Sequence, residues 1–218
     1  STISRQLTDI GFTRTNFNNP ADLYIINTCS VTENANRECR RIIRKAKKKS
    51  PRACIVLADC FAQWKPKEIT DIEGVDMVLG ANEKFNLPQL LTNLNKINKP
   101  EIHGCDIENL NYFSSYSLNE RTRSFLKIQD GCDYPCSYCT IPLARGKSRS
   151  DSIENIIMNA KDIASKGIKE IVITGVNIGD FKDNDKQFSD LIKKLDNIKG
   201  IERYRISSIE PNLITDEI

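Results

Sequence analysis

The most informative segment of the chain reads Ala53-Cys54-Ile55-Val56-Leu57-Ala58, six apolar residues in an unbroken run. Two further apolar stretches, residues 23–26 and 75–79, lie on either side of it in the sequence. Runs of this length are typical of strands in a parallel sheet that is covered on both faces. Helix-compatible polar segments alternate with them, and this alternation predicts an open α/β sheet. The expected helices cover residues 1–10, 32–49, 65–71 and 83–95.

A second α/β pattern begins near residue 122. Its expected strands cover residues 125–128, 170–174 and 204–207, and its expected helices cover residues 151–166 and 188–198. Residues 98–122 lose this periodicity and contain Pro100 and Gly104, which favours a linker. We therefore expect three parts: an N-terminal domain over residues 1–100, a linker over 101–121 and a C-terminal domain over 122–218.

The order of the expected elements also bears on the ends of the chain. No strand precedes the helix expected at residues 1–10, although a doubly wound sheet normally opens with a strand. Three βα units after residue 122 are too few to close a barrel. We expect the chain to lack an opening strand at its start and the remainder of a (β/α) barrel at its end.

Composition excludes several classes of protein. Hydrophobic residues make up 39% and charged residues 28% of the 218 residues, which argues against wholesale disorder, collagen-like sequence and coiled coil. No apolar run approaches the roughly 20 residues that cross a bilayer, so we expect no membrane association. The net charge is only +3, but residues 37–52 hold nine basic residues and one acidic residue. This basic segment fits either contact with phosphates or an ordinary solvated helix face.

Three cysteines, Cys132, Cys136 and Cys139, lie within eight residues in the loop after the strand expected at 125–128. Cysteine thiolates are the usual ligands of iron–sulfur clusters. Three ligands leave one iron of a four-iron cluster open to a substrate or cofactor. A structural zinc ion takes four ligands, and the sequence offers no fourth Cys or His nearby. Three buried structural cysteines are the alternative, which the Gly- and Pro-containing loop disfavours.

This motif resembles the radical S-adenosyl-L-methionine (SAM) superfamily. The resemblance implies that Cys132, Cys136 and Cys139 hold a 4Fe-4S cluster whose open iron binds SAM, and the aromatic Tyr138 before the last cysteine fits the same pattern. Two later segments lie where such a fold contacts SAM, beyond the carboxyl ends of strands. Ordinary βα turns are the alternative for both of them. Their candidate contact residues are Gly175, Asn177, Ser207 and Glu210.

Cys29 and Cys60 each follow an expected strand, so both lie at the same edge of the N-terminal sheet. The wider pattern, residues 27–35, Cys60 to Gln63 and the cysteine loop, resembles the methylthiotransferase family of radical SAM enzymes. The resemblance implies a Rossmann-like methylthiotransferase domain followed by a partial radical SAM barrel. It implies a second 4Fe-4S cluster, with Cys29 and Cys60 as two of its three ligands. The first ligand of the family has no counterpart here, which leaves this N-terminal site incomplete, and Asp59 replaces the usual glycine.

Short segments at residues 123–132, 141–150 and 174–179 are most similar to the branch that acts on N6-threonylcarbamoyladenosine beside the anticodon of tRNA. The resemblance implies a tRNA (N6-L-threonylcarbamoyladenosine(37)-C2)-methylthiotransferase with a tRNA substrate and a flavodoxin-type electron donor. A cytoplasmic location is expected because open clusters are sensitive to oxygen. The fragment is expected to be inactive alone, and its oligomeric state stays open.

Other functions remain open at this point. Sister branches of the family act on N6-isopentenyladenosine in tRNA or on an aspartate of a ribosomal protein. A different class of function, an iron–sulfur or zinc-binding module without SAM chemistry, is compatible with the cysteines by themselves.

Overall fold

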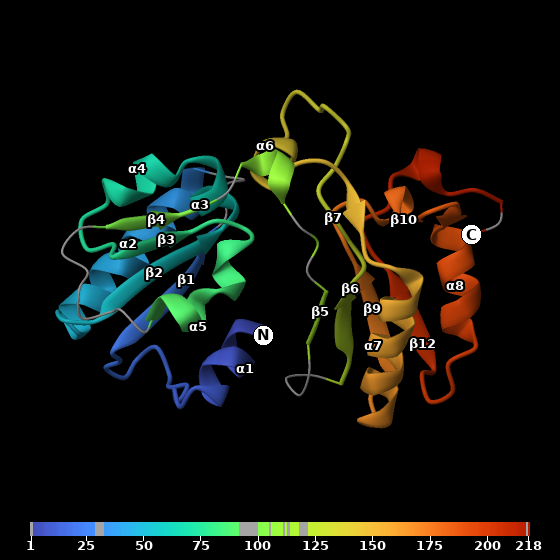
Figure 1. Cartoon of the computed structure of the whole chain (residues 1–218), viewed down its shortest axis with the longest axis horizontal. Helices are drawn as coiled ribbons and strands as arrows, with labels where there is room; N and C mark the ends of the chain where they lie inside the picture. Colours follow the sequence, from blue (N-terminus) through green and yellow to red (C-terminus); the bar gives the residue numbers. More distant parts are fainter. Residues whose placement is uncertain are drawn as a thin grey trace. The chain divides into compact units, whose positions relative to one another are not determined.

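The computed structural model describes residues 2–28, 33–91, 100–104, 106–110, 112, 114–117, 122–216 and 218 (Figure 1). The chain divides into two compact units. The N-terminal unit comprises residues 3–110 and 135–146, and the C-terminal unit comprises residues 1–2, 111–134 and 147–218. The division falls inside the cysteine loop, so Cys132 belongs to the C-terminal unit, whereas Cys136 and Cys139 belong to the N-terminal unit.

The N-terminal unit contains a four-stranded parallel sheet in the order β1-β2-β3-β4. Its first three strands are β1 (Leu23–Thr28), β2 (Cys54–Asp59) and β3 (Met77–Leu79), which form from the three apolar runs. The fourth, β4 (Glu101–His103), falls in the segment expected as a linker. It escapes sequence analysis because an exposed edge strand carries no apolar run.

Helices cover both faces of this sheet. One face packs against α2 (Glu33–Lys49), α3 (Cys60–Trp64) and α4 (Pro66–Thr70), and the other against α1 (Thr2–Asp9) and α5 (Leu87–Leu90). Side chains of β1 alternate between the two layers, because successive residues of a strand point to opposite faces. The helix expected at 65–71 begins at Pro66, which suits the first turn. Of the helix expected at 83–95, the described part is a short 3₁₀ turn, η1 (Glu83–Phe85), followed by α5, and residues 92–95 lie outside the described residues.

The C-terminal unit contains a second sheet in the order β12-β9-β6-β5. The strands β6 (Ser124–Lys127), β9 (Glu170–Thr174) and β12 (Arg203–Ile206) are parallel, and β5 (Ser115–Tyr116) pairs antiparallel with β6. The helices α7 (Ile153–Ser165) and α8 (Phe188–Asp196) pack with the strands into one apolar core, as the βαβ pattern predicts. A small hairpin, β10 (Lys182–Asp183) with β11 (Lys186–Gln187), precedes α8.

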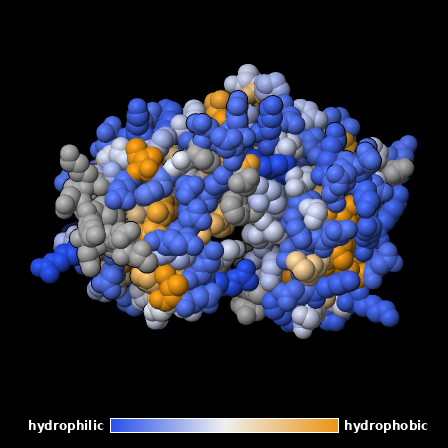
Figure 2. Space-filling model, viewed as in Figure 1, coloured by the Kyte–Doolittle hydropathy of each residue, from blue (hydrophilic) through white to orange (hydrophobic). Residues whose placement is uncertain are grey.

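The predicted α/β class with parallel sheets is confirmed. Hydrophilic residues dominate the face visible in Figure 2. Within the described part of the chain, none of the helices combines the length and apolar character that spanning a bilayer requires.

Candidate functional site

The cysteine loop leaves the C-terminal sheet through a short antiparallel ladder. The strands β7 (Gln129–Asp130) and β8 (Arg149–Ser150) pair Gln129 with Ser150 and Asp130 with Arg149. The ladder thus brings the two ends of the loop together. Two-residue strands have no periodicity, so sequence analysis missed this pair and predicted an open loop over 131–150.

The cysteines of the loop are accessible sulfur donors. Cys136 is exposed, Cys132 and Cys139 are half-buried, and none of the six cysteines that the structure describes forms a disulfide. The Cys139 amide donates to the Cys136 carbonyl oxygen at 3.0 Å, which places these two residues in one turn. Tyr138 is 89% exposed.

The donor set of this loop fits an iron–sulfur cluster, because such clusters take cysteine thiolates that stand on a loop. Across the described residues, no three Cys, His, Asp or Glu side chains are already gathered as a metal-binding group. The fit therefore rests on the type, spacing and accessibility of the three cysteines.

Asp130 fixes the chain just before the first of these cysteines. Its Oδ2 accepts from Lys127 Nζ at 2.8 Å and from an Arg149 amino group at 3.2 Å. Its Oδ1 accepts from the Gly131 amide at 3.0 Å. Asp130 is buried, so its negative charge requires the two cations that pair with it.

Gln129 is the residue of this site that sequence analysis missed. Its side chain is fully buried, and its Nε2 donates to the Gly131 carbonyl at 2.8 Å and to Ser148 Oγ at 2.9 Å. Its Oε1 accepts from the amides of Val176 and Asn177 at 2.9 and 3.0 Å. One amide side chain therefore ties both ends of the cysteine loop to the turn after β9. A glutamine next to the apolar strand residue Ile128 was the only local sign of it.

Gly175, predicted to contact SAM, packs against Gln129. A Cβ atom at this position would lie 2.7 Å from Ile178 Cγ2 and 2.9 Å from Gln129 Oε1, closer than real Cβ contacts allow. The glycine thus meets a packing requirement of the turn itself, as the alternative of an ordinary βα turn implies.

Asn177 and Glu210, also predicted to contact SAM, lie together. Asn177 is 3% exposed, and its Oδ1 accepts from the Glu210 amide at 3.3 Å while its Nδ2 donates to Asp180 Oδ2 at 3.1 Å. Ser207 Oγ donates to the Ile173 carbonyl at 2.8 Å. These contacts join the turn after β9 to the end of β12. The polar atoms of Asn177 and Ser207 therefore bind the protein itself, whereas Glu210 is exposed.

Negative charge gathers at this edge of the C-terminal sheet. Burial raises the pKa of Asp180, and the neighbouring carboxylates of Asp133 and Glu210 raise this pKa further. Asp133 is itself held by the Ser148 amide, which donates to its Oδ1 at 3.0 Å. Three carboxylates therefore lie near one another at this edge, with Lys182 as a nearby cation.

Cys60, the candidate ligand of the N-terminal unit, begins α3 where β2 ends and is buried. Arg145 Nε donates to Cys60 Sγ at 3.1 Å, and Cys60 Sγ lies 3.6 Å from Asp59 Oδ1. Burial raises the pKa of the Cys60 thiol, which the positive charge of Arg145 opposes. Cys29, predicted to meet Cys60, lies outside the described residues.

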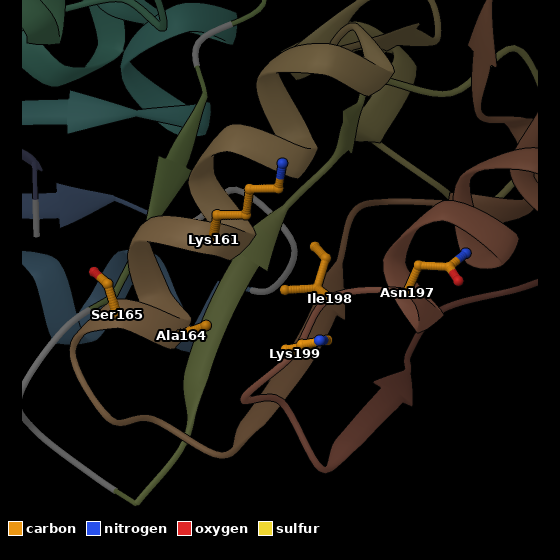
Figure 3. Close-up of a pocket in the computed structure, with 6 residues that line it drawn as sticks. All are labelled: Lys161, Ala164, Ser165, Asn197, Ile198 and Lys199. Carbon is orange, nitrogen blue, oxygen red and sulfur yellow. The ribbon is translucent and has the colours of Figure 1, made fainter.

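One pocket of the C-terminal unit lies away from these residues (Figure 3). Its lining comes from the end of α7 and from the segment after α8, which lead into the amino ends of β9 and β12. The predicted cofactor residues follow the carboxyl ends of the same strands, so the pocket takes no part in the candidate site. Its lining residues are Lys161, Ala164, Ser165, Asn197, Ile198 and Lys199.

Comparison with known proteins gives matches for both parts of the chain. Residues 1–80 match the uncharacterized protein family UPF0004, and residues 126–218 match the radical SAM superfamily. The threonylcarbamoyladenosine tRNA methylthiotransferase MtaB of Bacillus subtilis is 37% identical over 216 residues, which cover 96% of this chain and 48% of that protein. The chain is therefore similar to radical SAM methylthiotransferases over nearly its whole length.

Further relatives give the same picture. The MtaB protein of Aquifex aeolicus is 36% identical over 91% of the chain and 50% of its own length. The tRNA-2-methylthio-N(6)-dimethylallyladenosine synthase of Clostridium novyi is 30% identical over 99% of the chain and 50% of its own length. The chain thus spans about half the length of the curated relatives it matches.

Solved structures of a radical SAM methyltransferase, TsrM from Kitasatospora setae, share the fold of this chain. The form with cobalamin and a 4Fe-4S cluster matches with a TM-score of 0.58 at 14% identity, over 88% of this chain and 48% of that one. The form with tryptophan and a SAM analogue matches with a TM-score of 0.59 at 14% identity, over 97% and 56%. These likenesses support the arrangement of elements.

Proposed function

We propose that this protein is a tRNA (N6-L-threonylcarbamoyladenosine(37)-C2)-methylthiotransferase, which inserts a methylthio group into the adenosine beside the anticodon. The observation that carries this proposal is the 37% identity to the MtaB enzyme of Bacillus subtilis over 96% of the chain. Residues 1–100 serve as its methylthiotransferase domain, and residues 122–218 serve as part of its radical SAM domain, with the segment 101–121 between them.

Cys132, Cys136 and Cys139 would hold the 4Fe-4S cluster that serves SAM. When bound, this cluster supplies the electron that cleaves SAM reductively. The protein's own contribution is to position the loop, because Gln129 holds the two loop ends. Asp130 accepts a hydrogen bond from the amide of Gly131, the residue before Cys132, and is itself held by Lys127 and Arg149. A flavodoxin-type protein serves as the electron donor.

The SAM molecule itself would bind beside the turn after β9. The exposed carboxylate of Glu210 and the acidic surroundings of Asp180 favour the positive charges of a sulfonium and an ammonium group. Asn177 and Ser207 shape this edge through their backbone contacts, and Gly175 allows the turn to pack closely. Tyr138, exposed on the cysteine loop, is the aromatic residue available to cover the cofactor.

Cys29 and Cys60 would be two ligands of the second 4Fe-4S cluster, which would carry the sulfur that is transferred. Cys60 stands at the carboxyl end of β2, where ligands of parallel sheets bind.

The basic helix α2 would contact the phosphates of tRNA. The structure separates its cations into two groups. Lys47 pairs with Asp76 at 2.9 Å, and Lys49 donates to the Asn18 carbonyl at 2.6 Å, so both are used within the fold. Exposed cations four residues apart share one helix face, which suits a phosphate backbone. One such row consists of Arg40, Arg44 and Lys48.

The decisive experiment uses the full-length protein, reconstituted anaerobically with iron and sulfide. It is incubated with SAM, a reductant and tRNA that carries N6-threonylcarbamoyladenosine, and the nucleosides are analysed by mass spectrometry. We expect the methylthio derivative of that nucleoside, with no product from the variant Cys136→Ala. Product from N6-isopentenyladenosine tRNA or from a ribosomal protein substrate instead would overturn the proposed substrate. A zinc protein, or a cluster that does not cleave SAM, would overturn the proposed activity.

A further inference from the structure

Within the N-terminal unit, the helix that follows the three cysteines packs against the helix that begins with Cys60. This helix, α6 (Ile141–Arg145), contacts α3 along its length and ends at Arg145. Gly146 follows with a φ of +69°, and a Cβ atom there would lie 2.9 Å from the Ile107 carbonyl oxygen. Gly146 therefore packs closely against Ile107, and this packing fixes the backbone next to Arg145.

Arg145 meets Cys60 through its Nε atom, which donates to the Sγ atom at 3.1 Å. The two residues are 85 positions apart in the sequence. The other neighbour of this sulfur is the carboxylate of Asp59, at 3.6 Å, and this carboxylate pairs with Lys84 Nζ at 3.1 Å. The guanidinium of Arg145 therefore hydrogen-bonds directly to the sulfur, and Lys84 pairs with the carboxylate beside it.

The three basic residues Arg145, Lys147 and Arg149 have different surroundings. Arg145 is directed at a sulfur atom of its own unit, and Arg149 pairs with Asp130 in the C-terminal unit. Lys147, between them, is exposed. The three cations therefore have different roles, although they lie within five residues of each other.

We propose that Arg145 is a positioning residue of the sulfur site at Cys60. It donates a hydrogen bond to the Cys60 sulfur when that sulfur ligates the N-terminal cluster, and it raises the reduction potential of this cluster. The inference rests on the proposed role of Cys60 as a ligand. The physical reason is that each reduction adds negative charge to the cluster and its thiolates. A hydrogen bond from a cation to a ligating sulfur stabilises the reduced state more than the oxidised state.

The test uses the full-length protein with Cys132, Cys136 and Cys139 replaced by alanine, so that only the N-terminal cluster can form. Arg145→Gln and Arg145→Lys are introduced into this background, with Lys147→Gln as the matched loss of a nearby charge. Iron content, thermal unfolding and the midpoint potential, followed by electron paramagnetic resonance during a redox titration, are measured for each variant.

We expect Arg145→Gln to shift the midpoint potential to more negative values. At a fixed poise the ratio of oxidised to reduced cluster should rise tenfold, which corresponds to about 59 mV for a one-electron couple. Arg145→Lys should shift the potential in the same direction by less, because the charge remains but the Nε donor is lost. Lys147→Gln should leave the potential unchanged.

Equal potentials in the Arg145 variants and their parent would overturn the inference while leaving the proposed function intact. If Arg145→Gln does not fold, Arg145→Lys decides in its place by the same comparison. A parent protein that folds but holds no iron would also overturn it, because Cys60 would then not be a cluster ligand. Product formation by the wild-type protein on tRNA is measured separately, so failure of the proposed function is distinguishable.

Discussion

Gln129 and Gly175 are in direct contact at the base of the cysteine loop, where a Cβ atom on Gly175 would stand 2.9 Å from Gln129 Oε1. The same oxygen accepts hydrogen bonds from the amides of Val176 and Asn177, so a displacement of Gln129 breaks its hydrogen bonds to this turn. The two ends of the cysteine loop and the turn predicted to contact SAM are therefore one packed structure within the C-terminal unit.

The variant Gly175→Ala tests this packing. The added methyl group must move Gln129 or Ile178, and overpacking of this kind costs about 1–3 kcal/mol of unfolding free energy. Hydrogen exchange of residues 174–179, read by mass spectrometry, should become faster than in the wild-type protein. Gly104→Ala is the control, since a Cβ atom there meets nothing within 4 Å. Unchanged exchange in Gly175→Ala would contradict the packing.

Asp59 holds a backbone conformation that favours glycine, with φ +85° and ψ −151°. Substitution by alanine or by glycine removes the ion pair with Lys84, but only glycine also removes the backbone strain of about 1–3 kcal/mol. We expect Asp59→Gly to be more stable than Asp59→Ala in thermal unfolding, the reverse of the usual order. The exposed residue Asp71, with φ −74°, should show the usual order, with Asp71→Ala above Asp71→Gly.

Asp180 makes stability depend on pH, because burial first and the charges of Asp133 and Glu210 next raise its pKa in the folded state. A carboxyl group with a raised pKa binds its proton more tightly when folded, so its stabilising contribution is present below the unfolded pKa and is lost as pH rises. Asp180→Asn should therefore raise the melting temperature at pH 7 relative to wild type, and this gain should shrink toward pH 4. Asp185→Asn, an exposed change, should show no such trend.

Cysteine reactivity separates the loop thiols from the packed ones. Burial raises the pKa of Cys54 from 9.0 to about 11, which leaves roughly a hundredfold less thiolate at neutral pH. Iodoacetamide should therefore label the exposed Cys136 of the metal-free protein at least tenfold faster than Cys54, as measured by peptide mass spectrometry. Reconstitution with iron and sulfide should protect Cys136 and leave the slow rate of Cys54 unchanged. Labelling of Cys136 that iron does not slow would speak against a cluster at the loop.

The exposed cations of α2 give a prediction for tRNA binding by the full-length protein. Arg40→Gln combined with Arg44→Gln should weaken tRNA binding and reduce the slope of log affinity against log salt by about 1–2, since each phosphate contact contributes about 0.7–0.9. Lys161→Gln combined with Lys199→Gln, exposed lysines of the C-terminal unit, is the charge-matched control. Fluorescence anisotropy at several salt concentrations measures both. Equal slopes for the two double variants would contradict the proposed contact of α2 with tRNA.

Local patterns in the sequence were sufficient for the main elements, and they also predict the chemistry of the loop. The apolar runs at residues 23–26 and 53–58 predict β1 and β2 because burial on both faces of a sheet demands unbroken apolar residues. The spacing of Cys132, Cys136 and Cys139 indicates cluster chemistry because sulfur ligands on one short loop can serve one cluster. Short elements such as β4 and the β7–β8 pair escaped, since two or three residues cannot display a period.

By itself, the amino-acid sequence determined the α/β class and predicts the residues that would hold iron, because both follow from residue type and local spacing. The partners of these residues were decided only by the tertiary structure. Local sequence patterns predict neither the contact of Gln129 with Asn177 nor that of Arg145 with Cys60, because the paired residues are 48 and 85 positions apart. Such contacts form only where the packing of strands and helices brings distant parts of the chain together.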